Sequence, residues 1–151
     1  VERLMKMDRL IRGIESSVVE LEKELLKLGE HATWSPLDKG RTAVDQVAEC
    51  ALITDWVGQT LEDCTLAPMD WEAYGTTKAS LDTVEKALAA LKPATERCLA
   101  AMRQLPADKA DDVVELPWGE KYTLGDLANI VWWNNTYHNG QICYIQTLLG
   151  I

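Results

Sequence analysis

Apolar residues recur at alternating intervals of three and four along most of this chain. The opening segment shows this spacing without a break, at Leu4, Met7, Ile11, Ile14, Val18, Leu21, Leu25 and Leu28. Residues three and four positions apart share one face of an α-helix. The spacing therefore predicts a long first helix from Glu2 to Leu28, ended near Gly29 as glycine commonly ends helices.

Two further segments carry the same pattern. Thr42 has the capping-box spacing to Asp45 and predicts a second helix that runs to about Asp63. The third predicted helix covers residues 81–105, where the apolar residues keep their phase across Pro93. We expect one helix kinked at Pro93; two separate helices are the alternative, because an interior proline costs about 3 kcal/mol.

The segments between these helices lack the helical period. Residues 30–40 and 65–77 contain proline and glycine and are predicted to be loops. Residues 113–116 and 121–122 flank the turn-forming residues 117–120, which predicts a short β-hairpin before the last helix. Connections of this length do not force a simple up-and-down order of the helices.

The last predicted helix opens at Thr123 and runs to Leu149. Three consecutive positions on its apolar face are polar: Asn134, His138 and Gln141. Burying an amide or imidazole without a partner costs roughly 1–3 kcal/mol, so these groups need hydrogen-bond partners, water or a ligand. This polar notch is the candidate functional site, and a satisfied polar network that sets the register of the bundle is the alternative.

Four long helices with apolar stripes predict an all-α protein, a four-helix bundle that forms one domain over residues 1–151. The net charge of −9 argues against nucleic acid or an anionic membrane as a partner. The four cysteines lie far apart without C-x-x-C spacing and are expected to be reduced thiols. With neither a leader nor an uncharged apolar run of membrane-spanning length, a cytoplasmic protein is expected.

The chemistry of the notch depends on a second helix. Asn134 and His138 are four residues apart and face the same way. If Glu49 faces the same cavity, one nitrogen, one carboxylate and one amide oxygen could hold a divalent metal, less tightly than three imidazoles hold zinc. Glu49 and His138 could equally form a charge-assisted hydrogen bond without a metal.

Four stretches resemble motifs of the DinB/YfiT-like family. His138-Asn-Gly-Gln141 is similar to the motif H-R-G-Q that closes the family, and the stretches at Trp34-Ser-Pro, residues 40–50 and Pro117-Trp-Gly also match. The resemblance implies a four-helix bundle, often dimeric. Many members hold a divalent metal on three histidines, one on the second helix and two spaced H-x-x-x-H on the last.

Only one of these three histidines is present. His138 stands at the second position of the pair, Asn134 replaces its partner, and Glu49 or Cys50 stands at the second-helix position. Asn139 replaces the arginine that usually follows the last histidine.

Two functional hypotheses follow. The resemblance implies a metal-dependent hydrolase or a thiol-dependent transferase that acts on a small molecule, with Zn, Ni or Mn on His138, Glu49 and Asn134. The pocket would lie between the second and last helices, with Trp56, Trp133, Tyr137 and Gln141 as its walls. The alternative is a non-catalytic bundle that binds a small molecule or acts as a dimeric interaction module. A homodimer is expected because the tryptophans and apolar stripes exceed what one thin bundle can hide.

Overall fold

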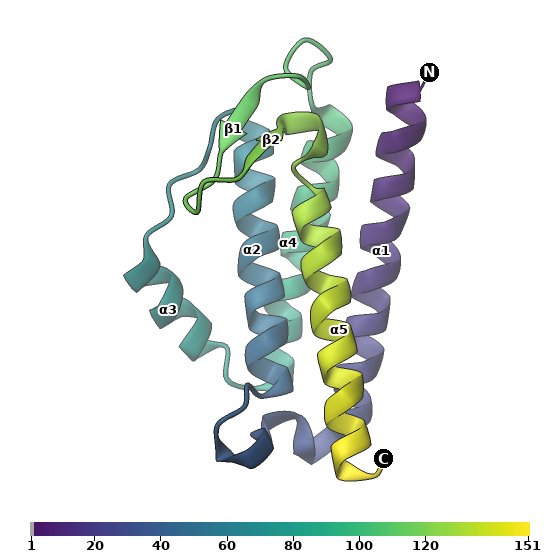
Figure 1. The fold of residues 1–151 in the computed structure, drawn as a ribbon, viewed down its shortest axis with the longest axis vertical. Coiled ribbons are helices and arrows are strands. Elements are labelled where there is room, and N and C mark those ends of the chain that lie inside the picture. Colours follow the sequence, from purple (N-terminus) through teal and green to yellow (C-terminus); the bar gives the residue numbers. More distant parts are fainter. Residues whose placement is uncertain (1) are drawn as a thin grey trace.

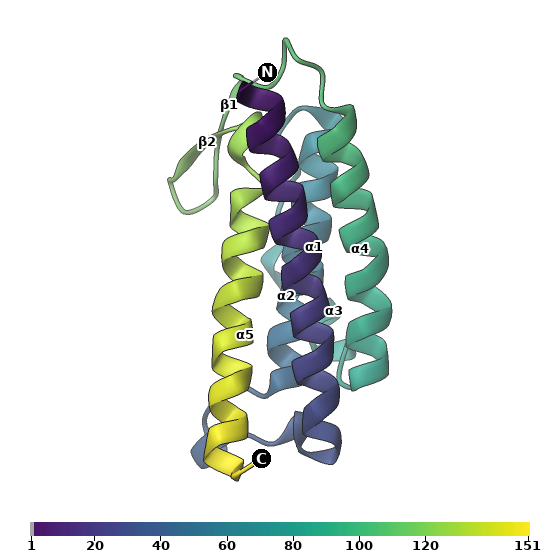
Figure 2. The same cartoon turned by 90° about the vertical axis from the view of Figure 1, so that its right-hand side faces the viewer.

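Four long helices form an elongated bundle in the computed structural model, which describes residues 2–151 (Figures 1 and 2). They are α1 (Glu2–Leu28), α2 (Ala43–Asp63), α4 (Val84–Gln104) and α5 (Asn129–Leu149). Helices α1 and α5 run in one direction and α2 and α4 in the other (Figure 1). Helix α2 packs against α4 and α5, and α1 packs against the same two helices. The predicted four-helix bundle is confirmed, and its chain order differs from a simple up-and-down bundle.

The turn from α1 into α2 follows local sequence signals. Gly29 has a positive φ of 55°, a conformation that glycine adopts at little cost, and it ends α1. Two short 3₁₀ turns follow, Gly29–Thr33 and Pro36–Asp38. The Thr42 hydroxyl then accepts a hydrogen bond from the Asp45 amide at 3.1 Å, so the predicted cap of α2 is confirmed.

A fifth helix, α3 (Trp71–Ser80), lies outside the bundle beside α2 (Figure 1). The prediction of a loop over residues 65–77 is therefore wrong from Trp71 onward. The Asp70 carboxylate caps α3 by accepting from the amides of Glu72 and Ala73, each at 3.0 Å. Every residue of α3 is exposed or half-buried, so the helix has no apolar stripe by which the sequence could reveal it.

Helix α3 lies on the long connection that returns the chain to the end of the bundle where α4 begins (Figure 1). Helix α4 continues through Pro93, as predicted, and starts at Val84 rather than at residue 81. The Thr83 hydroxyl caps it by accepting from the Lys86 amide at 3.2 Å. As a result α2 and α4 are parallel neighbours.

The predicted hairpin is confirmed as strands β1 (Val113–Glu115) and β2 (Lys121–Thr123), paired antiparallel with Val114 opposite Tyr122. Gly119 takes a φ of 93° in the turn. Val114 and Leu116 are buried against the bundle. This packing stabilises a hairpin that is too short to be stable alone.

Helix α5 starts later than predicted. Residues Leu124–Asp126 form a 3₁₀ turn, and α5 begins at Asn129. The Leu124 amide donates to the Asp112 carbonyl at 2.9 Å, and the Gly125 amide donates to the Ala110 carbonyl at 2.8 Å. Because this neighbouring backbone already satisfies the first amides, the predicted cap from Thr123 has no role there.

A layer of buried polar side chains divides the core into two apolar clusters. The cluster near the hairpin includes Ile14 and Leu127, and the cluster at the opposite end includes Leu25 and Ile142. Between them, each long helix contributes buried polar residues: Ser17, Thr54, Thr95, Asn134, Asn135 and His138. None of the helices in residues 2–151 is both long and apolar enough to span a bilayer.

Candidate functional site

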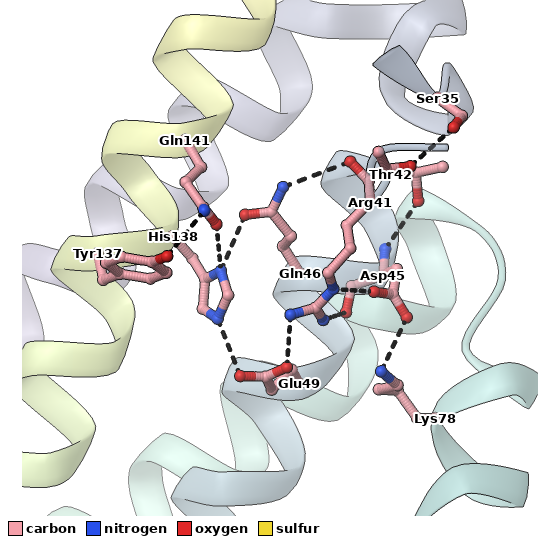
Figure 3. Close-up of polar contacts among 11 residues, drawn as sticks. Ser35, Arg41, Thr42, Asp45, Gln46, Glu49, Lys78, Tyr137, His138 and Gln141 are labelled. Atoms are coloured by element: carbon pink, nitrogen blue, oxygen red, sulfur yellow. Dashed lines mark hydrogen bonds and ion pairs between the residues drawn. The ribbon is translucent and has the colours of Figure 1, made fainter. Parts of the chain in front are cut away.

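His138 lies at the centre of a polar network that joins α5 to α2 (Figure 3). Its side chain is only 3% exposed. The Nε2 atom lies 2.9 Å from Glu49 Oε1, and the Nδ1 atom lies 2.8 Å from Gln46 Oε1 and 3.0 Å from Gln141 Oε1. The imidazole therefore meets an acceptor oxygen at each of its nitrogens.

Each glutamine amide has a further hydrogen-bond partner, and for Gln46 this partner defines its orientation. The Gln46 Nε2 atom donates to the Arg41 carbonyl at 3.5 Å, and the Gln141 Nε2 atom donates to the Tyr137 hydroxyl at 3.1 Å. A backbone carbonyl can only accept, so the Gln46 oxygen must be the atom that faces His138. His138 thus has glutamine side chains at one ring nitrogen and the Glu49 carboxylate at the other.

Glu49 is the second half of the network and has a partner on each oxygen. Its Oε1 atom accepts from His138, and its Oε2 atom lies 2.7 Å from Arg41 Nη1. Burial by itself would raise the pKa of Glu49. The hydrogen bond from His138 and the positive charge of Arg41 outweigh burial and lower this pKa to about 2, so Glu49 is a carboxylate at neutral pH.

The network continues outward from Arg41 to the surface. The Arg41 guanidinium also pairs with Asp45, one turn along α2, and Asp45 pairs with Lys78 of α3 at 3.2 Å (Figure 3). Negative and positive side chains alternate in this series, from Glu49 through Arg41 and Asp45 to Lys78. Each of these charges therefore has a partner of opposite sign.

Asn134 takes part in a different contact. Its Nδ2 atom donates to the Cys50 sulfur at 3.7 Å. Burial raises the pKa of the Cys50 thiol far above its usual range, with the negative charge of Glu49 adding to the effect. Cys50 is therefore a protonated thiol and a poor nucleophile or metal ligand.

A groove of about 890 Å³ opens beside this network, between the second half of α5 and residues 34–46, which lead into the start of α2. Its apolar walls come from Trp34, Pro36, Leu37, Tyr137, Tyr144, Ile145 and Leu148, and its polar groups from Arg41, Gln46 and Gln141. Of the four predicted wall residues, Tyr137 and Gln141 lie here. Trp133 lines a second groove, and Trp56 lies in the core, where its Nε1 donates to the Ala67 carbonyl at 2.9 Å.

Solved structures share this architecture. No family model and no curated protein matches the sequence, but a structure of YfiT from Bacillus subtilis superposes with a TM-score of 0.78 at 19% identity, covering 95% of this chain and 87% of that one. This chain has the YfiT fold. The YfiT structure is described as a probable metal-dependent hydrolase with an unusual four-helix bundle topology.

A mycothiol-dependent maleylpyruvate isomerase has the same fold. It superposes with a TM-score of 0.70 at 14% identity, and a point mutant of the isomerase does so with 0.72. The alignment covers 90% of this chain and 60% of the isomerase. Identities this low show the shared fold, and the chemistry at each site has to be judged from its own residues.

The residues around His138 do not fit a metal centre. Among residues 2–151, no three His, Cys, Asp or Glu side chains cluster closely enough to hold a metal ion. Both nitrogens of His138 face acceptor oxygens, and the cationic Arg41 lies against Glu49. A metal ligand needs a free lone pair on the imidazole, and a bound cation is repelled by a neighbouring guanidinium. The metal on His138, Glu49 and Asn134 thus stays a prediction from the sequence.

The sequence pattern did not indicate Arg41 or Gln46, although Arg41 contacts Glu49 and Gln46 contacts His138. Gln46 lies three positions before Glu49 and so shares its helix face. A buried glutamine on the apolar stripe of the second helix was the signal that could have pointed to it.

Proposed function

We propose that this protein binds a small molecule in the groove between α2 and α5 and does so without a catalytic metal. The proposal depends on one observation: His138 and Glu49 each have polar partners on both sides. His138 meets oxygens on both nitrogens, and Glu49 is shared between His138 and Arg41. In this arrangement Arg41 supplies the positive charge beside Glu49 that a metal ion would otherwise supply.

The groove suits a ligand with an apolar body and one polar end. Aromatic and aliphatic side chains make up most of its walls, as in pockets for small organic molecules. Arg41 and Gln141 lie on its polar side, and the Arg41 side chain is 40% exposed. A carboxylate or another hydrogen-bond acceptor on the ligand could reach this guanidinium, which donates at fixed angles.

Two features support binding over covalent catalysis. His138 is almost wholly covered, so a ligand in the groove meets Gln46 and Gln141 before it meets the imidazole. Burial raises the pKa of Cys50, which removes the nearest thiolate nucleophile.

A metal-dependent hydrolase or a thiol-dependent transferase is the second candidate. It is favoured by the meeting of His138 and Glu49 between α2 and α5 and by the descriptions of the similar structures, one a probable metal-dependent hydrolase and one a mycothiol-dependent isomerase.

Metal content separates the two candidates. For protein purified without an affinity tag, we expect elemental analysis to find far less than one transition metal ion per chain. We also expect an unfolding temperature that changes neither with EDTA nor with added Zn²⁺, Ni²⁺ or Mn²⁺, because a ligand that binds only the folded state raises that temperature. One metal ion per chain, lost in His138→Ala, would establish the second candidate instead.

Binding can be measured with two probes of the same shape, 2-naphthoate and the neutral 2-naphthylmethanol. We expect saturable shifts of the amide resonances of Gly140 and Tyr144, which line or adjoin the groove. Arg41→Ala should weaken the binding of 2-naphthoate by about tenfold, because one charge-assisted contact is lost. The binding of the alcohol should weaken much less. Arg97→Ala is the matched control, because Arg97 pairs with Asp55 and Glu62 away from the groove. If neither probe saturates these resonances, the groove is not a binding site.

A further inference from the structure

A second groove lies where the hairpin meets α5. Its volume is about 1080 Å³, and its aromatic walls are Trp118 and Tyr122 of the hairpin segment and Trp132 and Trp133 of α5. Half of the six tryptophans of the chain thus gather around one opening. Their exposed fractions are 48% for Trp118, 36% for Trp132 and 65% for Trp133.

Each of these three indoles packs against another residue of the protein. Trp118 packs on the buried Trp56, with ring centroids 6.1 Å apart, and Trp133 stacks on Tyr137 at 5.2 Å. Trp132 lies so close to α1 that a Cβ atom on Gly13 would fall 2.7 Å from its ring. The aromatic walls are therefore held in place before any ligand arrives, which lowers the entropy lost on binding.

The charge at this groove is negative. Within the described chain, Glu120 is the one charged side chain of the lining, and the Trp118 indole donates to its Oε2 atom at 2.8 Å. The closest lysine in sequence, Lys121, pairs with Glu115 at 3.5 Å. Residues 129–149, which span α5, contain no Asp, Glu, Lys or Arg, and the whole chain carries a net charge of −9.

Aromatic faces and a carboxylate together select a cation. The face of an indole carries negative potential and attracts an ammonium group within about 6 Å, and several such faces around one cavity are a common way to bind methylated amines. The Glu120 carboxylate attracts a cation to this groove and repels an organic anion from it. A neutral apolar ligand would make no use of Glu120.

From these observations we infer that the groove between the hairpin and α5 binds an organic ammonium cation, of the quaternary or N-methylated class. Trp132 and Trp133 would enclose the methyl groups, Trp118 would close the opposite side, and Glu120 would neutralise the charge at the rim. This site is separate from the groove of the proposed function, which adjoins it through the Trp133–Tyr137 stack.

The test uses choline and its uncharged carbon analogue 3,3-dimethyl-1-butanol, which have nearly the same shape. We expect choline to quench tryptophan fluorescence saturably and to bind the full chain at least about tenfold more tightly than the alcohol, as expected for a contact dominated by cation–π attraction. Trp133→Ala should lower the affinity for choline by about tenfold, and Glu120→Gln should lower it by a smaller factor. Calorimetry gives the affinity independently of how many tryptophans remain.

Trp71→Ala is the matched control. Trp71 is also an exposed tryptophan, but it lies on α3 and contacts Tyr74, away from this groove. Its removal should leave choline binding unchanged, and since Trp133 is largely exposed, both variants should keep the wild-type unfolding temperature. Equal affinity for choline and the alcohol, or equal loss in both tryptophan variants, would overturn the inference. So would sedimentation that shows the groove buried between two copies of the chain, with no choline bound.

Discussion

The Nε2 atom of His138 lies 2.9 Å from the Oε1 atom of Glu49, a contact that joins residues 89 positions apart on α5 and α2. On the other side of the ring the Oε1 atoms of Gln46 and Gln141 lie 2.8 and 3.0 Å from Nδ1, and the guanidinium of Arg41 pairs with the second oxygen of Glu49. This arrangement fixes the orientation of the buried imidazole, so the network both holds the two helices in register and forms one side of the groove.

The stability of the fold should depend on His138. His138→Ala removes the partner of three oxygens and leaves a cavity, so we expect the free energy of unfolding to fall by about 2–3 kcal/mol. Urea denaturation followed by circular dichroism measures this change. The matched control is His31→Ala, because the chain has two histidines and His31 is exposed. Equal stability of the two variants would show that the network does not stabilise the bundle.

Glu49 should make the free energy of unfolding depend on pH in the acidic range. Its pKa is about 2 in the folded protein and 4.5 for an ordinary glutamate, so its contribution is complete above pH 4.5 and is lost as the pH falls towards 2. The difference in unfolding free energy between the wild type and Glu49→Gln should shrink by roughly 3 kcal/mol between pH 6 and pH 2. Subtracting the variant cancels the other carboxylates. A difference that is constant across this range would contradict the pairing of Glu49.

Alanine should be unfavourable at Gly58, where α2 packs closely against α4. A Cβ atom at this position would lie 3.2 Å from the Cα atom of Cys98, and a backbone atom cannot move aside as a side chain can. We expect Gly58→Ala to destabilise the fold by about 1–3 kcal/mol, despite the higher helix propensity of alanine. Gly75 of α3 has open space around it, so Gly75→Ala should instead stabilise by up to about 1 kcal/mol. Thermal unfolding of both variants tests the contrast.

Two buried threonines on α2 should respond in opposite ways to valine. The Thr60 hydroxyl donates to the Trp56 carbonyl and accepts from the Ala67 amide, both at 3.0 Å. Thr60→Val would leave that amide buried without a partner, so we expect a loss of about 1–3 kcal/mol. The Thr54 hydroxyl has no hydrogen-bond partner among residues 2–151, so Thr54→Val should be neutral or stabilising. Chemical denaturation of both variants at one pH gives the comparison, and equal losses would contradict it.

How well the sequence predicted each helix depended on what stabilises that helix. Helices α1, α2 and α4 bury an apolar stripe, and the stripe is visible as a period in the sequence. Helix α3 buries no apolar stripe and depends on the Asp70 cap, so its sequence shows no apolar period. The start of α5 was misplaced because backbone groups of residues 110–112 take over the role of a cap.

The candidate site was predicted in part for similar reasons. The burial of Asn134 and His138 follows from their positions on an apolar face. Arg41 could not be selected, because an arginine just before a helix is usually solvated and only the distance to Glu49 gives it a role.

By itself, the sequence determined the four amphipathic helices, the hairpin and the buried polar notch, because each of these depends on periodicity or turn chemistry within a few residues. Only the tertiary structure decided that α2 and α4 run parallel, that Arg41 pairs with Glu49, and that tryptophans from the hairpin and α5 share one groove. These features depend on distances between residues far apart in the chain, which local preferences do not encode.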